Sequence, residues 1–182
     1  NDFPEVICHW YKQNGYHFVA MSDHNILAKG EKWMLVRDIN RRSAPLALGR
    51  YQKTFGDEWV QTRTNAEGHV EVRLKTLKEY RPKLEVADKF ILIQGEEITD
   101  RHGNAPVHMN ATNLKELIKP RGGKDVRDTM RRNLAAAAEQ AQRLGVPIMV
   151  HLNHPNFRWG ITAEDLAHVV EEQFFEVYNG HP

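Results

Sequence analysis

Apolar residues fall into two kinds of stretch along this chain, and the two kinds alternate. Helical spacing across residues 4–14 is followed by a short apolar run at 17–21, which is typical of a strand. Further on, the run at 90–93 predicts a second strand. Apolar positions repeated on one face across 126–144 predict a long helix that Gly145 ends. The alternation of helix and strand thus extends into the second half of the chain.

The last part of the chain continues this alternation. A strand is predicted within "VPIMVHLNHP", a helix opens at Thr162, and "FFEVYNGHP" supplies a final strand. Strands that alternate with helices indicate βα units and a mostly parallel sheet, so we expect an α/β fold. In such folds the catalytic and ligand-binding residues lie beyond the carboxyl ends of the strands. Polar clusters occur at those positions in this sequence.

Residues from about 27 to 89 interrupt the pattern. "KWMLVRDI" and "HVEVRLKTL" resemble strands, but no regular alternation with helices connects them. We expect a single domain over residues 1–182, with an insertion or lid at about 27–89. The chain opens on a predicted helix with no strand before it and closes on a strand with no helix after it. Because such ends leave sheet edges uncovered, we also expect a fragment that is incomplete at both ends.

The composition limits the kinds of metal ligand that this chain can supply, and it gives no sign of a membrane or nucleic-acid partner. No apolar run approaches the roughly 20 residues that span a bilayer, so membrane insertion is not expected. The net charge of +1 gives no support for a nucleic-acid partner. Because Cys8 is the one cysteine, an internal disulfide framework and a thiolate metal cage are excluded. With ten histidines in the chain, any metal site would use imidazole and carboxylate ligands.

The first polar cluster, "SDHN", directly follows the run at 17–21. His24 is the better candidate metal ligand, since imidazole is neutral and able to bind metal near pH 7. Asp23 could orient His24 or a neighbouring ligand. The alternative is that "SDH" is a turn that caps the next segment.

The second cluster contains two adjacent carboxylates, Glu96 and Glu97, after the run at 90–93. Consecutive strand residues face opposite sides, so one of them would point at the site and the other away from it. A carboxylate there could bridge two cations, one through each oxygen. The alternative is a solvated acidic turn.

Three histidines supply further candidates. His108 lies in a short strand-like segment, although a lone histidine there is also typical of a hydrogen-bonded core residue. Strand geometry would send His151 and Asn153 to one face, and His154 sits in a turn that Pro155 stiffens. His154 is therefore the stronger candidate ligand, and His151 would orient it or contact substrate.

Asn179 and His181 follow the last predicted strand, at the position that the other clusters occupy. We expect them to contact substrate. A structural turn at residues 179–180 is the alternative.

Taken in order, five segments resemble the motifs of the PHP (polymerase and histidinol phosphatase) superfamily: "FVAMSDHN", "LIQGEEIT", "HMNATN", "HLNHPNF" and "EVYNGHP". The resemblance implies a distorted (β/α)7 barrel, related to the TIM barrel and incomplete at both ends here. It also implies two or three divalent metal ions. The family's opening H-x-H strand would lie before Asn1 and its closing D-x-H strand beyond Pro182, so this stretch lacks both.

Carried over residue by residue, the resemblance assigns the inward carboxylate of the "GEE" motif to Glu97. The implied metal ligands are His24, Glu97, His108 and His154. Asp23 and His151 would orient ligands or shuttle protons.

The resulting hypothesis is a metal-dependent hydrolase, a phosphoesterase with metal-bound hydroxide as nucleophile and a small-molecule phosphate ester as substrate. Zinc, manganese and iron all suit the mixed imidazole and carboxylate ligands. Two alternatives stay open. One is a non-catalytic PHP-like scaffold or binding module, and the other is a metal hydrolase acting on a non-phosphate ester or amide.

Overall fold

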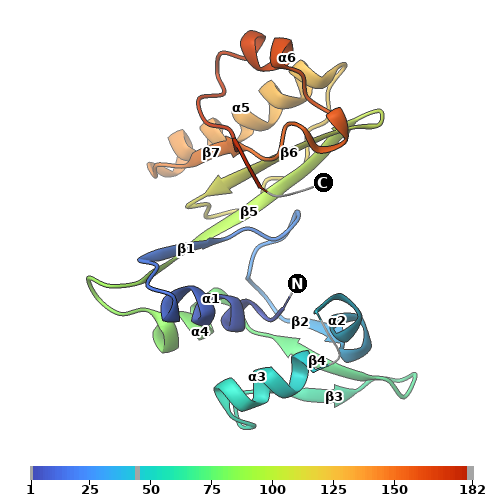
Figure 1. Ribbon diagram of the computed structural model, residues 1–182, viewed down its shortest axis with the longest axis vertical. Helices are drawn as coiled ribbons and strands as arrows, with labels where there is room; N and C mark the ends of the chain where they lie inside the picture. Colours follow the sequence, from blue (N-terminus) through green and yellow to red (C-terminus); the bar gives the residue numbers. More distant parts are fainter. Residues whose placement is uncertain (1, 44–45, 180–182) are drawn as a thin grey trace. The chain divides into compact units, whose positions relative to one another are not determined.

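The computed structural model describes residues 2–43 and 46–179, and it divides the chain into two compact units (Figure 1). The first unit comprises residues 1–19 and 28–92, and the second comprises residues 20–27 and 93–182. The segment expected to be an insertion or lid, 27–89, lies almost entirely within the first unit. The candidate site residues lie in the second unit.

The expected (β/α)7 barrel is wrong. Within the described residues the fold is mixed α/β, with one sheet of order β1-β5-β6-β7 and a smaller one of order β2-β4-β3, and neither sheet closes. The physical reason is a hairpin: β5 (Ile91–His102) turns back through a two-residue loop, Gly103–Asn104, into β6 (Ala105–Thr112). A βα barrel needs a crossover helix after each strand, and none separates this pair.

The expected mostly parallel sheet is also wrong, because the β5–β6 and β6–β7 pairs of the larger sheet are both antiparallel. After β1 (Phe18–Met21), His24 forms a parallel bridge with Glu97 of β5. β6 runs antiparallel to both β5 and β7 (Met149–Leu152). A parallel bridge then joins Leu152 to Phe175, which is all that forms of the strand predicted in "FFEVYNGHP". Strands β1, β5 and β7 therefore end toward the same side of the sheet.

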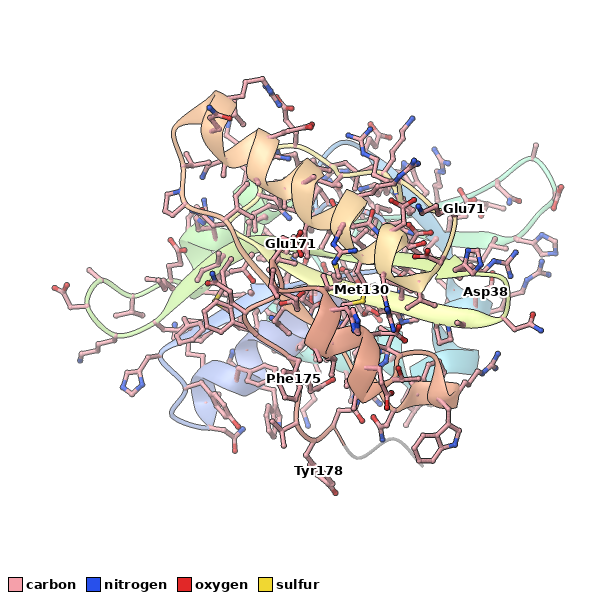
Figure 2. The ribbon with its side chains drawn as sticks, turned by 90° about the horizontal axis from the view of Figure 1, so that it is seen from above. Asp38, Glu71, Met130, Glu171, Phe175 and Tyr178 are labelled. Atoms are coloured by element: carbon pink, nitrogen blue, oxygen red, sulfur yellow. The ribbon has the colours of Figure 1, made fainter. Side chains whose placement is uncertain are left out.

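One helix covers one face of this sheet. The predicted helix over residues 126–144 is confirmed as α5 (Val126–Leu144), which Asp125 caps through the backbone N–H of Asp128 and Gly145 ends in the left-handed region. Met130 of α5, labelled in Figure 2, belongs to one buried core with Ile98, Met109 and Leu152. Among the described residues, no helix is both long and apolar enough to cross a membrane.

Two short elements follow β7: the 3-10 turn η1 (Phe157–Trp159) and helix α6 (Ala163–His168). The predicted helix start at Thr162 is confirmed, because Thr162 and Asp165 form a capping box. Together η1 and α6 connect β7 to the segment that pairs beside it.

The first unit has its own core and its own sheet. Its strands, β2 (Lys32–Leu35), β3 (Thr62–Thr64) and β4 (Val70–Leu74), are all antiparallel to their neighbours. Strand β4 confirms the one predicted in "HVEVRLKTL", whereas β2 confirms only the first half of "KWMLVRDI", because Val36 begins a helix. The helices of this unit are α1 (Pro4–Gln13), α2 (Val36–Ser43), α3 (Ala47–Phe55) and α4 (Leu77–Leu84).

Candidate metal centre

Polar side chains share the face of the larger sheet that α5 does not cover. Successive pairings connect His24 to Glu97, Glu97 to Asn110, and Asn110 to His151, which makes one row across the sheet. Residues paired across strands share a face, and the face alternates with every residue. Thr99 and His108 form the next pair on this face, because each lies two residues closer to the hairpin than Glu97 and Asn110 do.

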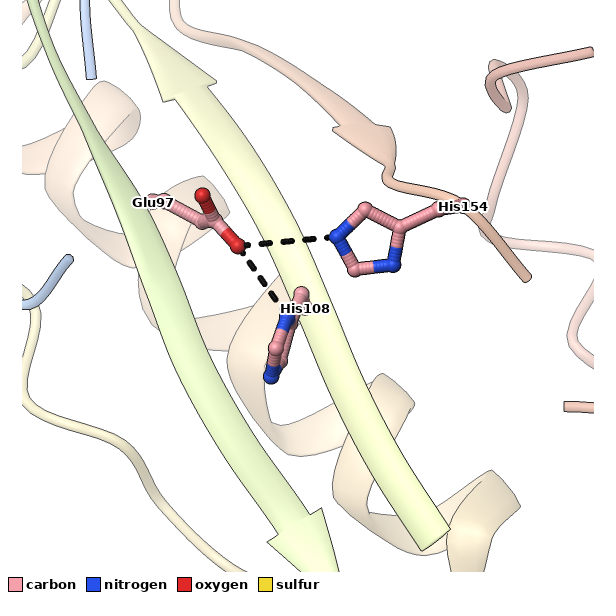
Figure 3. A group of neighbouring side chains, drawn as sticks. All are labelled: Glu97, His108 and His154. Carbon is pink, nitrogen blue, oxygen red and sulfur yellow. Dashed lines mark ion pairs between the residues drawn. The ribbon is translucent and has the colours of Figure 1, made fainter. Parts of the chain in front are cut away.

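Three histidine side chains, from these rows and from the turn after β7, surround one carboxylate oxygen of Glu97, and Figure 3 shows two of them, His108 and His154, beside Glu97. The Oε1 atom of Glu97 lies 3.1 Å from Nδ1 of His108 and 3.8 Å from Nε2 of His154. Nδ1 of His24 lies 3.5 Å from the same oxygen. The structure thus brings together all four residues that the sequence proposed as metal ligands.

The four side chains are not equally buried. Those of Glu97, His108 and His154 are each 13% exposed, whereas that of His24 is 65% exposed. His24 also has a second partner, because its Nδ1 lies 2.5 Å from the hydroxyl oxygen of Thr99. The site is therefore a half-enclosed group of three residues with His24 at its rim.

Two buried atoms in this group have no hydrogen bond. Oε1 of Glu97 and Nδ1 of His108 are close enough for an ion pair, but they are not aligned as a hydrogen-bond donor and acceptor. Buried polar atoms in proteins are nearly always hydrogen bonded, so two such atoms side by side need another partner. A cation between them would be coordinated by both.

The spacing of the ligand atoms fits that partner. Zinc binds nitrogen and oxygen ligands at about 2.0–2.1 Å in a tetrahedral arrangement, which separates neighbouring ligand atoms by roughly 3.4 Å. One ligand atom each from Glu97, His108 and His154 lie within 4.8 Å of one another. Imidazole and carboxylate together suit zinc, manganese or iron. These residues therefore fit a divalent transition metal.

Electrostatics place two of these groups in the protonation state that binds metal. Burial acts to raise the pKa of Glu97, but the contact with His108 and the nearby charge of His24 and His154 outweigh it, and the pKa is lowered. Burial, followed by the charge of His108, lowers the pKa of His154. Near neutral pH the site therefore holds an ionised carboxylate and a neutral imidazole, as metal binding requires.

Glu96 does not belong to this group. It is fully buried, and its Oε2 accepts the backbone N–H of Ile118 at 2.9 Å. Burial raises its pKa to about 7. Of the adjacent pair, the structure places Glu97 in the cluster and Glu96 in the protein interior.

His154 is held in an unusual backbone conformation by a residue that the sequence did not indicate. Its φ is 27°, and its backbone N–H donates to Oε2 of Glu176 at 2.8 Å. The same oxygen accepts the side-chain amide of Asn179 at 3.1 Å. Asn179 is therefore linked to His154 by way of the Glu176 carboxylate. Glu176 directly follows the Phe175 bridge, just as the other polar residues follow strands. The expected contact of Asn179 with substrate stays a prediction.

His151 lies in the row of Glu97 but outside the group of ligand atoms. Its Nε2 is 3.4 Å from Nδ2 of Asn110, and Oδ1 of Asn110 accepts the side-chain amide of Asn153 at 3.1 Å. Burial lowers the pKa of His151, against the opposing charges of Glu176 and Glu97. A neutral His151 that accepts from Asn110 at Nε2 carries its proton on Nδ1. Its role in orienting ligands or shuttling protons stays a prediction.

The remaining predicted residues have different outcomes. Asp23 is exposed, and its backbone carbonyl accepts the N–H of Glu97 at 3.0 Å, which fixes β5 beside His24. Its orienting role also stays a prediction. His181 lies outside the described residues.

Thr99 is a site residue that the sequence did not indicate. The side chain of Asn25 fixes its backbone, donating to its carbonyl at 3.0 Å and accepting its N–H at 2.9 Å. The available signal was its position two residues after Glu97, which places both side chains on one face of a strand.

The fold and the cluster together define an α/β protein with a candidate metal centre of one carboxylate and three imidazoles. No protein family model and no curated protein matches this chain. The likeness to the PHP superfamily therefore rests on the five quoted segments.

Proposed function

We propose that this protein is a metal-dependent hydrolase that acts on a phosphate ester. One observation carries the proposal: three imidazole nitrogens, from His24, His108 and His154, lie within 3.8 Å of a single carboxylate oxygen. The ordered likeness to PHP motifs supports phosphate esters over other substrates.

The residues of the site have two proposed roles, metal binding and proton transfer. Glu97, His108 and His154 hold the metal from the buried side, and His24 completes the ligand set from the rim. A bound divalent metal lowers the pKa of a water molecule and neutralises charge on phosphoryl oxygens. His151 would orient the ligands or shuttle protons, and Asn110 fixes the orientation of its ring through Nε2.

The two buried atoms without hydrogen bonds argue against a scaffold that lacks metal. Leaving a buried polar atom unsatisfied costs about 1–3 kcal/mol, and more for a charged group. Oε1 of Glu97 and Nδ1 of His108 are buried without an aligned hydrogen bond, and their 3.1 Å ion pair offsets only part of this cost. A coordinated cation would give both atoms a further partner.

The test compares two adjacent carboxylates. Wild type, Glu97→Gln and Glu96→Gln proteins are purified, and bound metal is measured by elemental analysis beside hydrolysis of 4-nitrophenyl phosphate. We expect Glu97→Gln to lose metal and hydrolysis together. Glu96→Gln should keep both, because it alters a carboxyl group on the opposite face. Wild-type protein without stoichiometric metal, or Glu97→Gln protein with unchanged metal and rate, would refute the proposal.

A further inference from the structure

A pocket adjoins the candidate metal centre. It has a volume of about 790 Å³, which lies within the range of small-molecule sites. The β5–β6 hairpin forms one wall, with Arg101, Pro106 and His108, and the turn after His154 forms another, with Phe157 and Arg158. Because His108 belongs to both the pocket and the metal centre, a molecule bound at the centre can extend into the pocket.

The turn that carries Phe157 and Arg158 is fixed in place. Gly160 packs so closely on Pro106 that an added Cβ would lie 2.6 Å from the proline ring. The N–H of Phe157 donates to the carbonyl of His154 at 2.8 Å, and the two rings are 5.1 Å apart. The position of Phe157 is thereby linked to that of a metal ligand.

Backbone strain is concentrated in this turn. His154, Arg158 and Trp159 all have positive φ, at 27°, 52° and 52°. None is glycine, and such conformations cost roughly 1–3 kcal/mol each and cluster at ligand sites. The strained turn aims Arg158 at the pocket, where its guanidinium lies 5.4 Å from the centre of the Phe157 ring.

The pocket has an excess of positive charge. In the described part of the chain, neither Arg101 nor Arg158 forms a side-chain ion pair. Asp100 also borders the pocket, but its carboxylate already accepts from the backbone of Gly122 and the side chain of Asn133, both at 2.9 Å. Two guanidinium groups are therefore available to an anion, since guanidinium binds carboxylate and phosphate through paired hydrogen bonds.

We propose that this pocket binds the organic part of the substrate and selects a phosphate ester that carries a second anionic group. The proposal rests on the proposed function, which places the scissile phosphate at the metal centre. Phe157 packs against the organic part, and Arg101 and Arg158 bind the second anionic group, a carboxylate or a further phosphate.

Binding of non-hydrolysable phosphonates tests this selection without requiring turnover. Metal-loaded wild-type protein is titrated calorimetrically with 4-carboxybenzylphosphonate and with its neutral counterpart, 4-carbamoylbenzylphosphonate. We expect the carboxylate to bind about tenfold tighter or more, which is the worth of one charge-assisted hydrogen bond. A xylylene bisphosphonate in a third titration shows whether a second phosphate is preferred to a carboxylate.

Variants locate the effect. Arg101→Gln and Arg158→Gln should each reduce the preference for the anionic ligand by several fold. Arg132→Gln, on α5 and paired with Asp128, is the matched control and should keep the preference. Circular dichroism checks that each variant is folded.

The outcomes separate this proposal from the proposed function. Equal binding of the charged and neutral ligands, absence of binding, or a preference that survives both pocket variants would overturn the pocket assignment while leaving metal content and 4-nitrophenyl phosphate hydrolysis untouched. Glu97→Gln protein with unchanged metal content and rate would overturn the hydrolase, whereas a ligand preference that Arg101→Gln and Arg158→Gln reduce would still support the pocket assignment.

Discussion

Glu96 and Glu97 are consecutive residues of β5, and the sheet places their carboxyl groups on opposite faces. Burial raises the pKa of Glu96 to about 7. The pKa of Glu97 is lowered, because its contact with His108 and the nearby histidine charges outweigh its own burial. One peptide bond thus separates a carboxylic acid in the core from a carboxylate in the candidate metal centre.

The unequal burial of the histidines predicts a graded loss of metal affinity. His108→Ala or His154→Ala should weaken Zn²⁺ or Mn²⁺ binding by more than the 10–100-fold that loss of an outer partner causes. His24→Ala should weaken it less, because His24 is 65% exposed and is shared with Thr99. Isothermal titration of each metal into apo protein measures the series. An equal loss in all three variants would contradict the ranking.

The sequence predicted the separate strands better than their arrangement. Periodicity identified β4 and α5, because each has a regular apolar pattern, and it identified β2 in part, since the segment predicted as that strand continues into α2. The barrel was wrong because alternating strands and helices were taken to imply crossovers throughout. A two-residue Gly103–Asn104 loop is a recognised hairpin signal that would have corrected this inference.

The site residues were identifiable by type and by position after strands, but their grouping depends on register. The pairing of Glu97 with Asn110, and of Asn110 with His151, sets which side chains are neighbours. A shift of one residue would move His108 to the α5 face. Register comes from the packing of Ile98 and Met109 beneath α5, which no local sequence pattern specifies.

The buried carboxyl of Glu172 predicts a pH dependence of stability. Burial raises its pKa from 4.5 to about 7, and its Oε2 is buried without a hydrogen bond. The folded state therefore holds a proton that the unfolded state loses above pH 4.5, so this group's contribution to stability falls as pH rises toward 7 and is constant beyond. Glu172→Gln removes this term. We expect the stability of Glu172→Gln relative to wild type to increase between pH 5 and 7.

Urea denaturation at several pH values measures this difference. The comparison cancels other titrating groups, such as the histidines, which act in both proteins. Parallel stability curves for the two proteins would show that the pKa of Glu172 is not raised.

A hydrogen bond in the first unit predicts a specific loss of stability. The hydroxyl of Tyr51 donates to Oε1 of Glu5 at 2.5 Å, and both residues are fully buried. Tyr51→Phe keeps the ring that stacks on Phe3 but removes this donor. It should lower the free energy of unfolding by about 1–3 kcal/mol. Tyr16→Phe, at an exposed ring, should change it by less than about 0.5 kcal/mol, and equal effects would contradict a role for the bond.

The contact of Gly160 with Pro106 predicts that even one methyl group is too large there. An added Cβ would lie 2.6 Å from the proline ring and 2.8 Å from its carbonyl oxygen, so the turn must move. Gly160→Ala should destabilise the protein by about 1–3 kcal/mol, as overpacking does. Gly49→Ala, in α3 with no atom within 4 Å, should instead stabilise it by roughly 0.5–1 kcal/mol. Thermal denaturation of both variants distinguishes the two cases, and a Gly160→Ala protein as stable as wild type would show that the turn is not fixed by this contact.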